Sequence, residues 1–98
     1  MKFLILQRAK KDVPLEKWAK LLPLQFAYFD RLEKEKVVEV NYHLIGQQGS
    51  MLVVNVGSDE ELSKVIGEDP MFFEVEREVY PLTSRKVMEK QVANIFRR

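Results

Sequence analysis

The segment that most constrains the fold of this chain is the almost continuous apolar run from Met51 to Val56, which only Asn55 interrupts. A short run of this kind predicts a strand in the middle of a sheet, buried on both faces. A second short apolar run, from Lys2 to Gln7, is too short for a helix and also predicts a strand. Two such strands require a sheet that other strands extend on either side.

Two further segments alternate between apolar and polar residues, which is the period of a strand with one polar face. In residues 37–45 the apolar set is Val38, Val40, Tyr42 and Leu44, and the polar set is Glu39, Asn41 and His43. In residues 72–82 the apolar set is Phe73, Val75 and Val79, and the acidic set is Glu74, Glu76 and Glu78. Pro81 ends this second ladder. Both segments therefore predict edge strands, with the polar residues on the side of the sheet that helices do not cover.

Three segments have the spacing of amphipathic helices. The first spans residues 14–36, and Pro23 inside it predicts a kink or a break near Leu22. Its apolar stripe is Trp18, Leu22, Phe26 and Phe29. Ser58 and Glu61 form a capping box at the start of the second helix, which ends by Gly67. Ser84 caps the third helix, whose stripe is Val87, Met88, Val92, Ile95 and Phe96.

The order strand, helix, strand, strand, helix, strand predicts an α+β, ferredoxin-like βαββαβ antiparallel sheet with an added C-terminal helix. We expect residues 1–83 to form this domain and residues 84–98 to form a helix involved in oligomer contacts. The first and third strands of this fold are central and apolar on both faces, so the face without helices has an apolar centre and a polar rim. That is the anatomy of an interface, and it predicts that the chain pairs with itself.

Composition and charge narrow the function classes. The chain has 98 residues, enough for one domain, and its 16 Lys and Arg against 15 Asp and Glu leave a net charge of +1. This balance gives no field to attract nucleic acid or an anionic membrane. The absence of cysteine excludes disulfides, thiolate metal sites and cysteine nucleophiles, and it makes the cytoplasm the expected location. The apolar start, Phe3 to Leu6, is far shorter than a signal-peptide core or a membrane span.

The stretch from His43 to Leu82 resembles the second half of the muconolactone isomerase family, small dimeric α/β-barrel proteins of aromatic-compound breakdown. The landmarks that match at the same spacing are Gly46, the Val56-Gly57-Ser58 step into a helix with Leu62, Pro70 before an apolar-aromatic pair, and Pro81. The resemblance implies a subunit whose sheet packs on another copy as a dimeric α/β barrel. It also implies a pocket between sheet and helices for a small cyclic acid.

The chain departs from this family where the family carries its chemistry. Gln47 stands where the family usually has a histidine, and Gln48 replaces the aromatic residue that follows. In the first helix the stretch Leu24 to Ala27 replaces an acidic-basic cluster. Isomerisation of a lactone needs a base beside a carbonyl and an acid to return the proton, and an amide supplies neither. We therefore expect isomerase chemistry to be absent, and we expect no cofactor.

The remaining candidates for chemistry are few. His43 is the only histidine, and histidine is the residue type that titrates near neutrality, so it is either a weak catalytic candidate or a hydrogen-bonded interface residue. No metal site is expected, because neither a second histidine nor a cysteine is present. The residues expected to line a ligand pocket are Trp18, Phe26, Tyr28, Tyr42, Gln47 and Phe72, with Phe29 beside them.

Three interpretations of the function follow from these residues. The first is a homo-oligomeric small-molecule-binding protein without the isomerase chemistry. The second is an isomerase or a small monooxygenase that acts on a cyclic or aromatic acid, the monooxygenase resting on analogy of fold alone. The third is a non-catalytic accessory or scaffold subunit. A closed cavity with convergent polar groups would separate the first two from the third.

Overall fold

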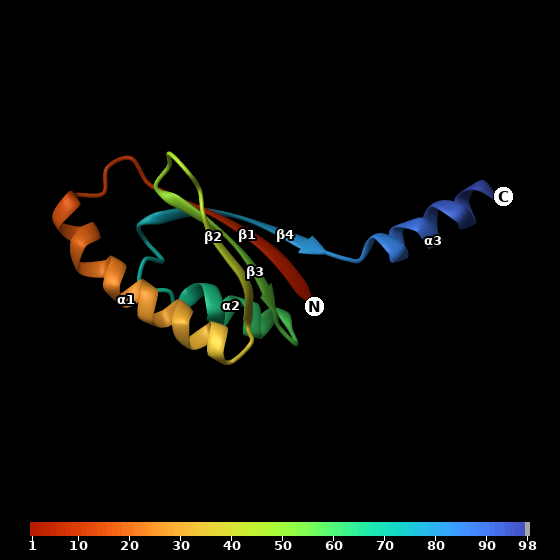
Figure 1. The fold of residues 1–98 in the computed structure, drawn as a ribbon, viewed down its shortest axis with the longest axis horizontal. Helices are drawn as coiled ribbons and strands as arrows, with labels where there is room; N and C mark the ends of the chain where they lie inside the picture. Colours follow the sequence, from red (N-terminus) through yellow and green to blue (C-terminus); the bar gives the residue numbers. More distant parts are fainter. Residues whose placement is uncertain (98) are drawn as a thin grey trace.

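The computed structural model describes residues 1–97. Within them the elements along the chain are β1 (Lys2–Ala9), α1 (Leu15–Lys34), β2 (Val38–His43), β3 (Gly49–Asn55), α2 (Asp59–Gly67), β4 (Val75–Leu82) and α3 (Arg85–Phe96). The strands form one antiparallel sheet in the order β2-β3-β1-β4, with α1 and α2 on one of its faces (Figure 1). β1 and β3 are therefore central, and the predicted α+β ferredoxin-like fold with an added C-terminal helix is confirmed.

The hydrophobic core lies between the sheet and the two helices. Alternate residues of the central strands point toward the helices, and Ile5 and Leu52 are each only 2% exposed. The helices contribute Tyr28, Phe29, Leu32 and Val65 to this cluster. Burial of side chains of this size stabilises a fold by about 1.5 to 3 kcal/mol each. The apolar periodicity of the strands thus fixes which face of the sheet the helices cover.

The helices begin and continue largely as their sequence patterns predict. α1 is one helix that runs through Pro23, so the single helix is the form observed rather than two short ones. At the start of α2, the hydroxyl of Ser58 accepts the backbone N–H of Glu61. The carboxylate of Glu61 accepts the backbone N–H of Gly57 at 2.7 Å. This is the predicted capping box, with its return bond made one residue earlier than usual.

α1 ends in a Schellman motif that carries a lysine where glycine is usual. The N–H of Lys36 donates to the carbonyl of Glu33 at 3.0 Å, and the N–H of Val37 donates to the carbonyl of Leu32 at 2.9 Å. Lys36 adopts a φ of 61°, in the left-handed region that side chains with a Cβ disfavour. The turn into β2 therefore forms at the cost of backbone strain.

A β-bulge near the start of β2 shifts its register against β3. Val38 pairs with Val54 and Val40 pairs with Val53, so Glu39 is an extra residue between two successive partners. Because side chains alternate between faces along a strand, one extra residue reverses the alternation for everything after it.

The bulge corrects the expected orientation of the polar residues of β2. Asn41 and His43 point toward α1, on the covered face of the sheet. Tyr42 pairs with Met51 on the opposite, open face and is 67% exposed. The prediction that Asn41 and His43 share an uncovered polar face with Glu39 is wrong for this reason.

β4 begins at Val75, three residues later than the alternation in residues 72–82 predicts. Phe72 and Phe73 instead lie in the turn before the strand and pack edge to face, with 5.0 Å between ring centroids. Phe73 is 75% exposed, so it does not share the strand face of Val75 and Val79 as expected. The pattern is interrupted because these residues form a turn, in which the N–H of Phe72 donates to the carbonyl of Asp69 and the N–H of Glu74 donates to the carbonyl of Met71.

The face of the sheet that points away from α1 and α2 is apolar across all its strands, and we refer to it as the open sheet face. The residues that the register places there are Leu4, Leu6, Val40, Tyr42, Met51, Val53, Tyr80 and Leu82. Lys2, Arg8, Glu76 and Glu78 flank this set with charge. In residues 1–97 no element covers the open sheet face.

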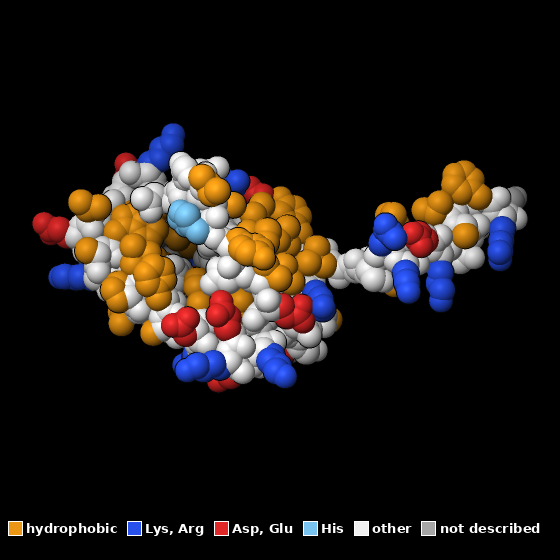
Figure 2. Space-filling view, viewed as in Figure 1, with side chains coloured by type: hydrophobic (Ala, Val, Ile, Leu, Met, Phe, Trp, Pro, Cys, Tyr) orange, Lys and Arg blue, Asp and Glu red, His pale blue; other side chains and the backbone are white. Residues whose placement is uncertain are grey.

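α3 projects away from the body of the protein (Figure 1), and none of its described residues is buried. Its cap is the one predicted, since the hydroxyl of Ser84 accepts the N–H of Val87. The apolar stripe is at least 41% exposed throughout. Figure 2 shows hydrophobic side chains along one side of α3 and basic ones along the other. Across residues 1–97, none of the helices combines the length and the apolar character that crossing a membrane requires.

Candidate functional site

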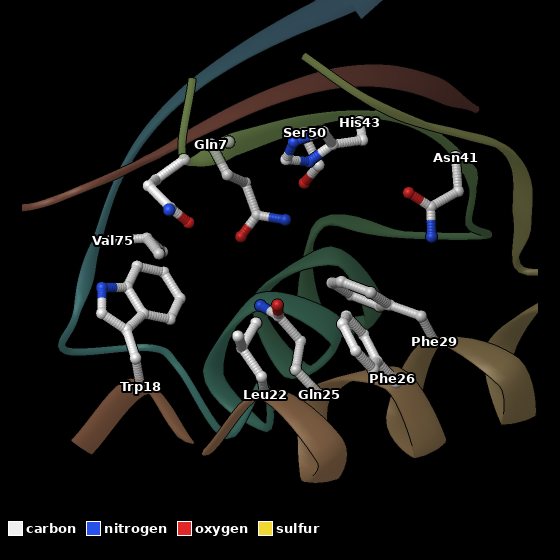
Figure 3. A pocket seen from close by; sticks show the side chains of 12 residues that line it. Gln7, Trp18, Leu22, Gln25, Phe26, Phe29, Asn41, His43, Ser50 and Val75 are labelled. Atoms are coloured by element: carbon white, nitrogen blue, oxygen red, sulfur yellow. The ribbon is translucent and has the colours of Figure 1, made fainter. Parts of the chain in front are cut away.

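A cavity of about 220 Å³ lies between α1 and one end of the sheet. Its helix wall is apolar and consists of Trp18, Leu22, Phe26 and Phe29, which recur every three or four residues along α1 (Figure 3). In the space-filling view, the single histidine borders a hollow whose other side is hydrophobic (Figure 2). The stripe predicted for the first helix therefore forms one wall of a cavity as well as part of the core.

The opposite wall is a row of polar side chains across three neighbouring strands. Gln7 of β1 pairs with Ser50 of β3, and Ser50 pairs with His43 of β2. Asn41 lies two residues before His43 on the same face of β2 (Figure 3). Register, rather than sequence proximity, brings these groups together opposite the aromatic wall.

Gln7 is the most deeply buried member of this row. It is 3% exposed, and its Oε1 atom has no hydrogen-bond partner within residues 1–97. Leaving a buried acceptor unpaired costs about 1 to 3 kcal/mol. At the neighbouring Gly49, an added Cβ would collide with the carbonyl oxygen of Gln7, so glycine is needed for β3 to approach β1 here. The cavity edge is therefore built closely around a polar group that the fold does not satisfy.

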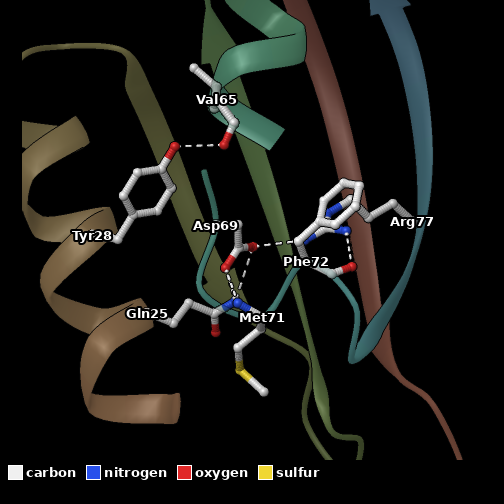
Figure 4. Close-up of polar contacts among 7 residues, drawn as sticks. All are labelled: Gln25, Tyr28, Val65, Asp69, Met71, Phe72 and Arg77. Atoms are coloured by element: carbon white, nitrogen blue, oxygen red, sulfur yellow. Dashed lines mark hydrogen bonds and ion pairs between the residues drawn. The ribbon is translucent and has the colours of Figure 1, made fainter. Parts of the chain in front are cut away.

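A second glutamine, Gln25 of α1, is held by a buried polar cluster beside the cavity (Figure 4). Its Nε2 donates to both carboxylate oxygens of Asp69, at 3.1 and 3.2 Å. Asp69 also accepts the N–H of Met71 and forms an ion pair with Arg77, both at 2.9 Å. Arg77 in turn donates to the carbonyl of Phe72. The cluster joins the turn after α2 to α1 and fixes the Gln25 carboxamide.

The cavity lining includes one histidine, His43, and histidine is the residue type that most often transfers protons near neutral pH. The bulge at Glu39 turns His43 toward α1 instead of toward the open sheet face. Within residues 1–97, no three histidine or acidic side chains gather closely enough to hold a metal ion.

The structure separates the residues expected to line one pocket. Trp18, Phe26 and Phe29 line the cavity, as does the candidate His43. Tyr28 lies instead in the core, beside a second hollow between α1 and α2. This placement corrects its expected position, because on a helix the residue next to Phe29 faces about 100° away from it.

Tyr28 has a structural partner of its own. Its hydroxyl donates to the backbone carbonyl of Val65 on α2 at 2.6 Å. Burial, followed by the negative charges of Glu68 and Asp69, raises the pKa of Tyr28 to about 12. The phenol therefore stays protonated and joins α1 to α2.

Three other predicted pocket residues lie outside the cavity. Tyr42 is on the open sheet face because of the bulge. Gln47 is in the exposed turn between β2 and β3, where its Oε1 accepts the Nε–H of Arg8 at 3.1 Å. Phe72 packs under the guanidinium of Arg77, 5.3 Å from the ring centroid, in the turn before β4. The expectation that these three line the same pocket as Trp18 is corrected accordingly.

On the polar side of the cavity, sequence reasoning named His43 but missed Gln7 and Gln25. Gln7 had a signal, since it continues the alternation of Phe3 and Ile5 and so occupies a position that points into the core. Gln25 had one too, because it lies three residues after Leu22 on the apolar side of α1. A polar residue in a buried register indicates either a structural partner or a ligand. Gln25 has the former in Asp69.

An aromatic wall that faces amides, a hydroxyl and an imidazole can hold a planar ring and orient its substituents. The amides and Ser50 can form hydrogen bonds but do not transfer protons near neutral pH. Proton transfer at this site would depend on His43.

Two solved structures share the fold. One is a crystal structure of muconolactone isomerase, with a TM-score of 0.76 and 22% sequence identity, covering 86% of this chain and 90% of the other. The second is 5-chloro-2-hydroxyhydroquinone dehydrochlorinase from Burkholderia phenoliruptrix in complex with 2,5-dihydroxybenzoquinone, with a TM-score of 0.71 and 19% identity, covering 85% and 94% of the two chains. No family model and no curated protein sequence matches this chain. The resemblance to muconolactone isomerase is thus confirmed as a likeness of fold.

Proposed function

We propose that this chain is a homo-oligomeric protein that binds one small cyclic ligand in the cavity between α1 and the sheet, without muconolactone isomerase chemistry. The observation that carries the proposal is the convergence of an aromatic wall and a polar wall on one cavity. Its volume of about 220 Å³ exceeds the roughly 150 Å³ of an apolar cavity that binds benzene. One substituted ring therefore matches the available space.

The lack of isomerase chemistry follows from what occupies the cavity walls. Gln25 and Gln48 line the cavity, and Gln47 is turned outward to Arg8. These are the segments in which the resemblance implies proton-transferring groups, and here they carry amides. The loss of a general acid or base typically costs 10²- to 10⁴-fold in rate, so turnover of muconolactone should be absent or very weak.

Self-association is supported by two uncovered apolar surfaces. The open sheet face is apolar across neighbouring strands and has a charged rim. The stripe of α3 is equally exposed, and a 12-residue helix is marginal in water unless its apolar side is covered. A second copy of the chain can cover both surfaces at once, since each copy offers the same pair. The family resemblance of residues 43–82 also implies pairing through the sheet.

A second candidate function is an isomerase or small monooxygenase that acts on a cyclic or aromatic acid. The orientation of His43 into the cavity favours it, because this places one titratable group where a ring would lie. A non-catalytic scaffold is the third candidate, and it needs no ligand at all. These candidates differ in whether the cavity is occupied and whether His43 matters.

Trp18 provides the test, because it is the only tryptophan of the chain and lines the cavity. Titration with muconolactone, with 2,5-dihydroxybenzoquinone and with the uncharged ring phenol, followed by tryptophan fluorescence, should give a saturable change with at least one of them. Ser50→Phe, which fills the cavity, should abolish it. Ser63→Phe, the same change on the exposed side of α2, should leave it intact.

Each outcome selects one candidate. Saturation without muconolactone turnover supports the proposed binding protein. Turnover that His43→Gln abolishes would instead establish the isomerase. A fluorescence response that is linear for all three probes, and identical in Ser50→Phe and Ser63→Phe, would leave the scaffold.

A further inference from the structure

The polar groups of the cavity differ in what they can offer a ligand, and this bears on the ligand's chemical class. The amide nitrogen of Gln25 donates to Asp69, so the group that Gln25 offers to the cavity is its carbonyl oxygen. Gln7 has an Oε1 atom without a partner in the described structure. The terminal torsion of glutamine is soft, so its carboxamide can turn this oxygen toward a ligand. Gln25 therefore presents an acceptor, and Gln7 presents one from the opposite wall once its carboxamide turns.

Apart from the imidazole of His43, the described lining of the cavity lacks a cationic partner for an acid. Among the described residues that line it there is neither lysine nor arginine. The nearby Arg77 is paired with Asp69 at 2.9 Å, and Lys17 is paired with Glu74 at 2.6 Å. Burial of a carboxylate without a counter-charge is strongly unfavourable. A carboxylic acid, the ligand class that the resemblance implies, thus finds no permanently charged partner among the described residues that line this cavity.

A cationic ligand is also disfavoured, because the described lining of the cavity offers it no negative charge. The lining contains no aspartate or glutamate among the residues described. The carboxylate behind Gln25, Asp69, is 5% exposed and already neutralised by Arg77. Apart from the His43 imidazole, what remains is a site without charged side chains among the described residues, with an aromatic wall and hydrogen-bond acceptors, and such a site favours a neutral ring that donates hydrogen bonds.

We propose that the cavity selects an uncharged, hydroxylated ring whose hydroxyl group donates a hydrogen bond to the carboxamide of Gln7. This inference rests on the proposed function, because it names the class of ligand for the same cavity. It accounts for the buried, unpaired Oε1 atom of Gln7, since the hydroxyl of a bound ligand supplies the hydrogen-bond donor that this atom lacks in the described structure. A site with a buried acceptor discriminates against an analogue that lacks the donor, because the acceptor is then left unpaired.

The test compares four one-ring probes in ¹H–¹⁵N NMR titrations of the 98-residue chain at pH 8. Phenol carries the donor and is neutral at this pH, as the tyrosine side chain is. Anisole has the same ring and oxygen without the donor, while benzoate and benzylammonium are charged. We expect shifts to map to the cavity, with phenol binding about tenfold or more tightly than each of the other three.

The variant Gln7→Leu removes the acceptor and keeps a side chain of similar volume. It should reduce the ratio of phenol to anisole affinity to near one while the thermal midpoint is unchanged or higher, because an unsatisfied buried group has been removed. Asn55→Leu is a matched change of an amide to leucine at the exposed far end of β3, and it should keep the wild-type ratio.

The failures of the two proposals are distinguishable. If no probe shifts the cavity resonances in the wild-type protein, the proposed ligand-binding function itself is refuted. If rings bind in the cavity but anisole equals phenol, or benzoate or benzylammonium binds more tightly, only the inferred ligand class is refuted. Retention of the phenol preference in a folded Gln7→Leu protein would also refute it, since another group would then provide the acceptor.

Discussion

Replacement of Asp69 by asparagine tests whether the buried cluster beside the cavity holds the fold together. Asp69 accepts the amide of Gln25, the backbone N–H of Met71 and the guanidinium of Arg77. The side chains of Asp69 and Arg77 are only 3% and 10% exposed. Asparagine keeps the volume of the side chain but removes the charge, and its NH₂ group must then face one of these donors.

The cost follows from leaving Arg77 buried without its counter-charge. Breaking a buried ion pair by changing one partner typically costs about 3 to 5 kcal/mol. A chain of this size has a total stability of about 5 to 15 kcal/mol, and each kcal/mol moves the thermal midpoint by about 4 to 8 °C. We therefore expect Asp69→Asn to lower the midpoint by at least about 12 °C, measured by circular dichroism at one protein concentration.

Glu78→Gln is the matched control, because Glu78 and Arg8 form an exposed pair at 3.8 Å. Such pairs contribute about 0 to 1 kcal/mol, so the control should change the midpoint by only a few degrees. Arg77→Met, alone and combined with Asp69→Asn, completes a double-mutant cycle. Equal, small effects of Asp69→Asn and Glu78→Gln, or additive effects of the two cluster variants, would refute the reasoning from burial.

Four further outcomes are expected. Lys36→Gly should raise stability by about 1 kcal/mol in urea unfolding, because φ is 61° there; no gain would contradict strain at this turn. The pKa of Tyr28 is raised from 10.0 to about 12 in the folded chain, so the phenol ionises at lower pH in the unfolded chain and the stability of the wild-type protein should fall between pH 10 and 12. Tyr28→Phe should flatten that fall while lowering stability at pH 7 by about 1 kcal/mol. An unchanged alkaline stability profile in Tyr28→Phe would contradict this assignment. Val53→Asp should give a folded monomer in light scattering, whereas Leu52→Asp, on the buried face, should unfold the chain; a wild-type monomer at micromolar concentration would end the argument for pairing. Deletion of residues 84–98 should lower the oligomeric state or the thermal midpoint and preserve the strand signal; unchanged assembly and melting would show that α3 is a free appendage.

The order of helices and strands could be predicted because each element has a clear period. The run from Met51 to Val56 is central, as its composition requires, and the capping box at Ser58 begins α2. Pro23 left two outcomes open, and local pattern alone could not choose between them. The packing of the buried turns of α1, which include Phe29 and Leu32, keeps the helix continuous through that position.

The candidate site was predictable on its helix side and not on its sheet side. Trp18 and Phe26 follow a 3.6-residue period that no local irregularity disturbs, so their shared wall could be inferred. Phe72 could not be placed, because the alternation of residues 72–82 gives no sign that a turn precedes Val75. One inserted residue in β2 places Tyr42 and His43 on the opposite faces of the sheet from those expected. Residue propensities do not indicate where such an insertion occurs.

That inserted residue also explains why the cavity is polar. In an unbroken ladder from Val38, the side chains of Val40 and Tyr42 would face α1, and the sheet wall beside Ser50 would be apolar and filled by a phenol ring. The bulge at Glu39 turns both outward, where they extend the open sheet face, and brings smaller polar groups inward. Bulges are frequent next to functional sites because they re-aim side chains without altering the rest of the sheet. One irregularity in β2 thus supplies both the apolar area on which the proposed pairing depends and the room beside the Gln7 carboxamide that the proposed ligand would occupy.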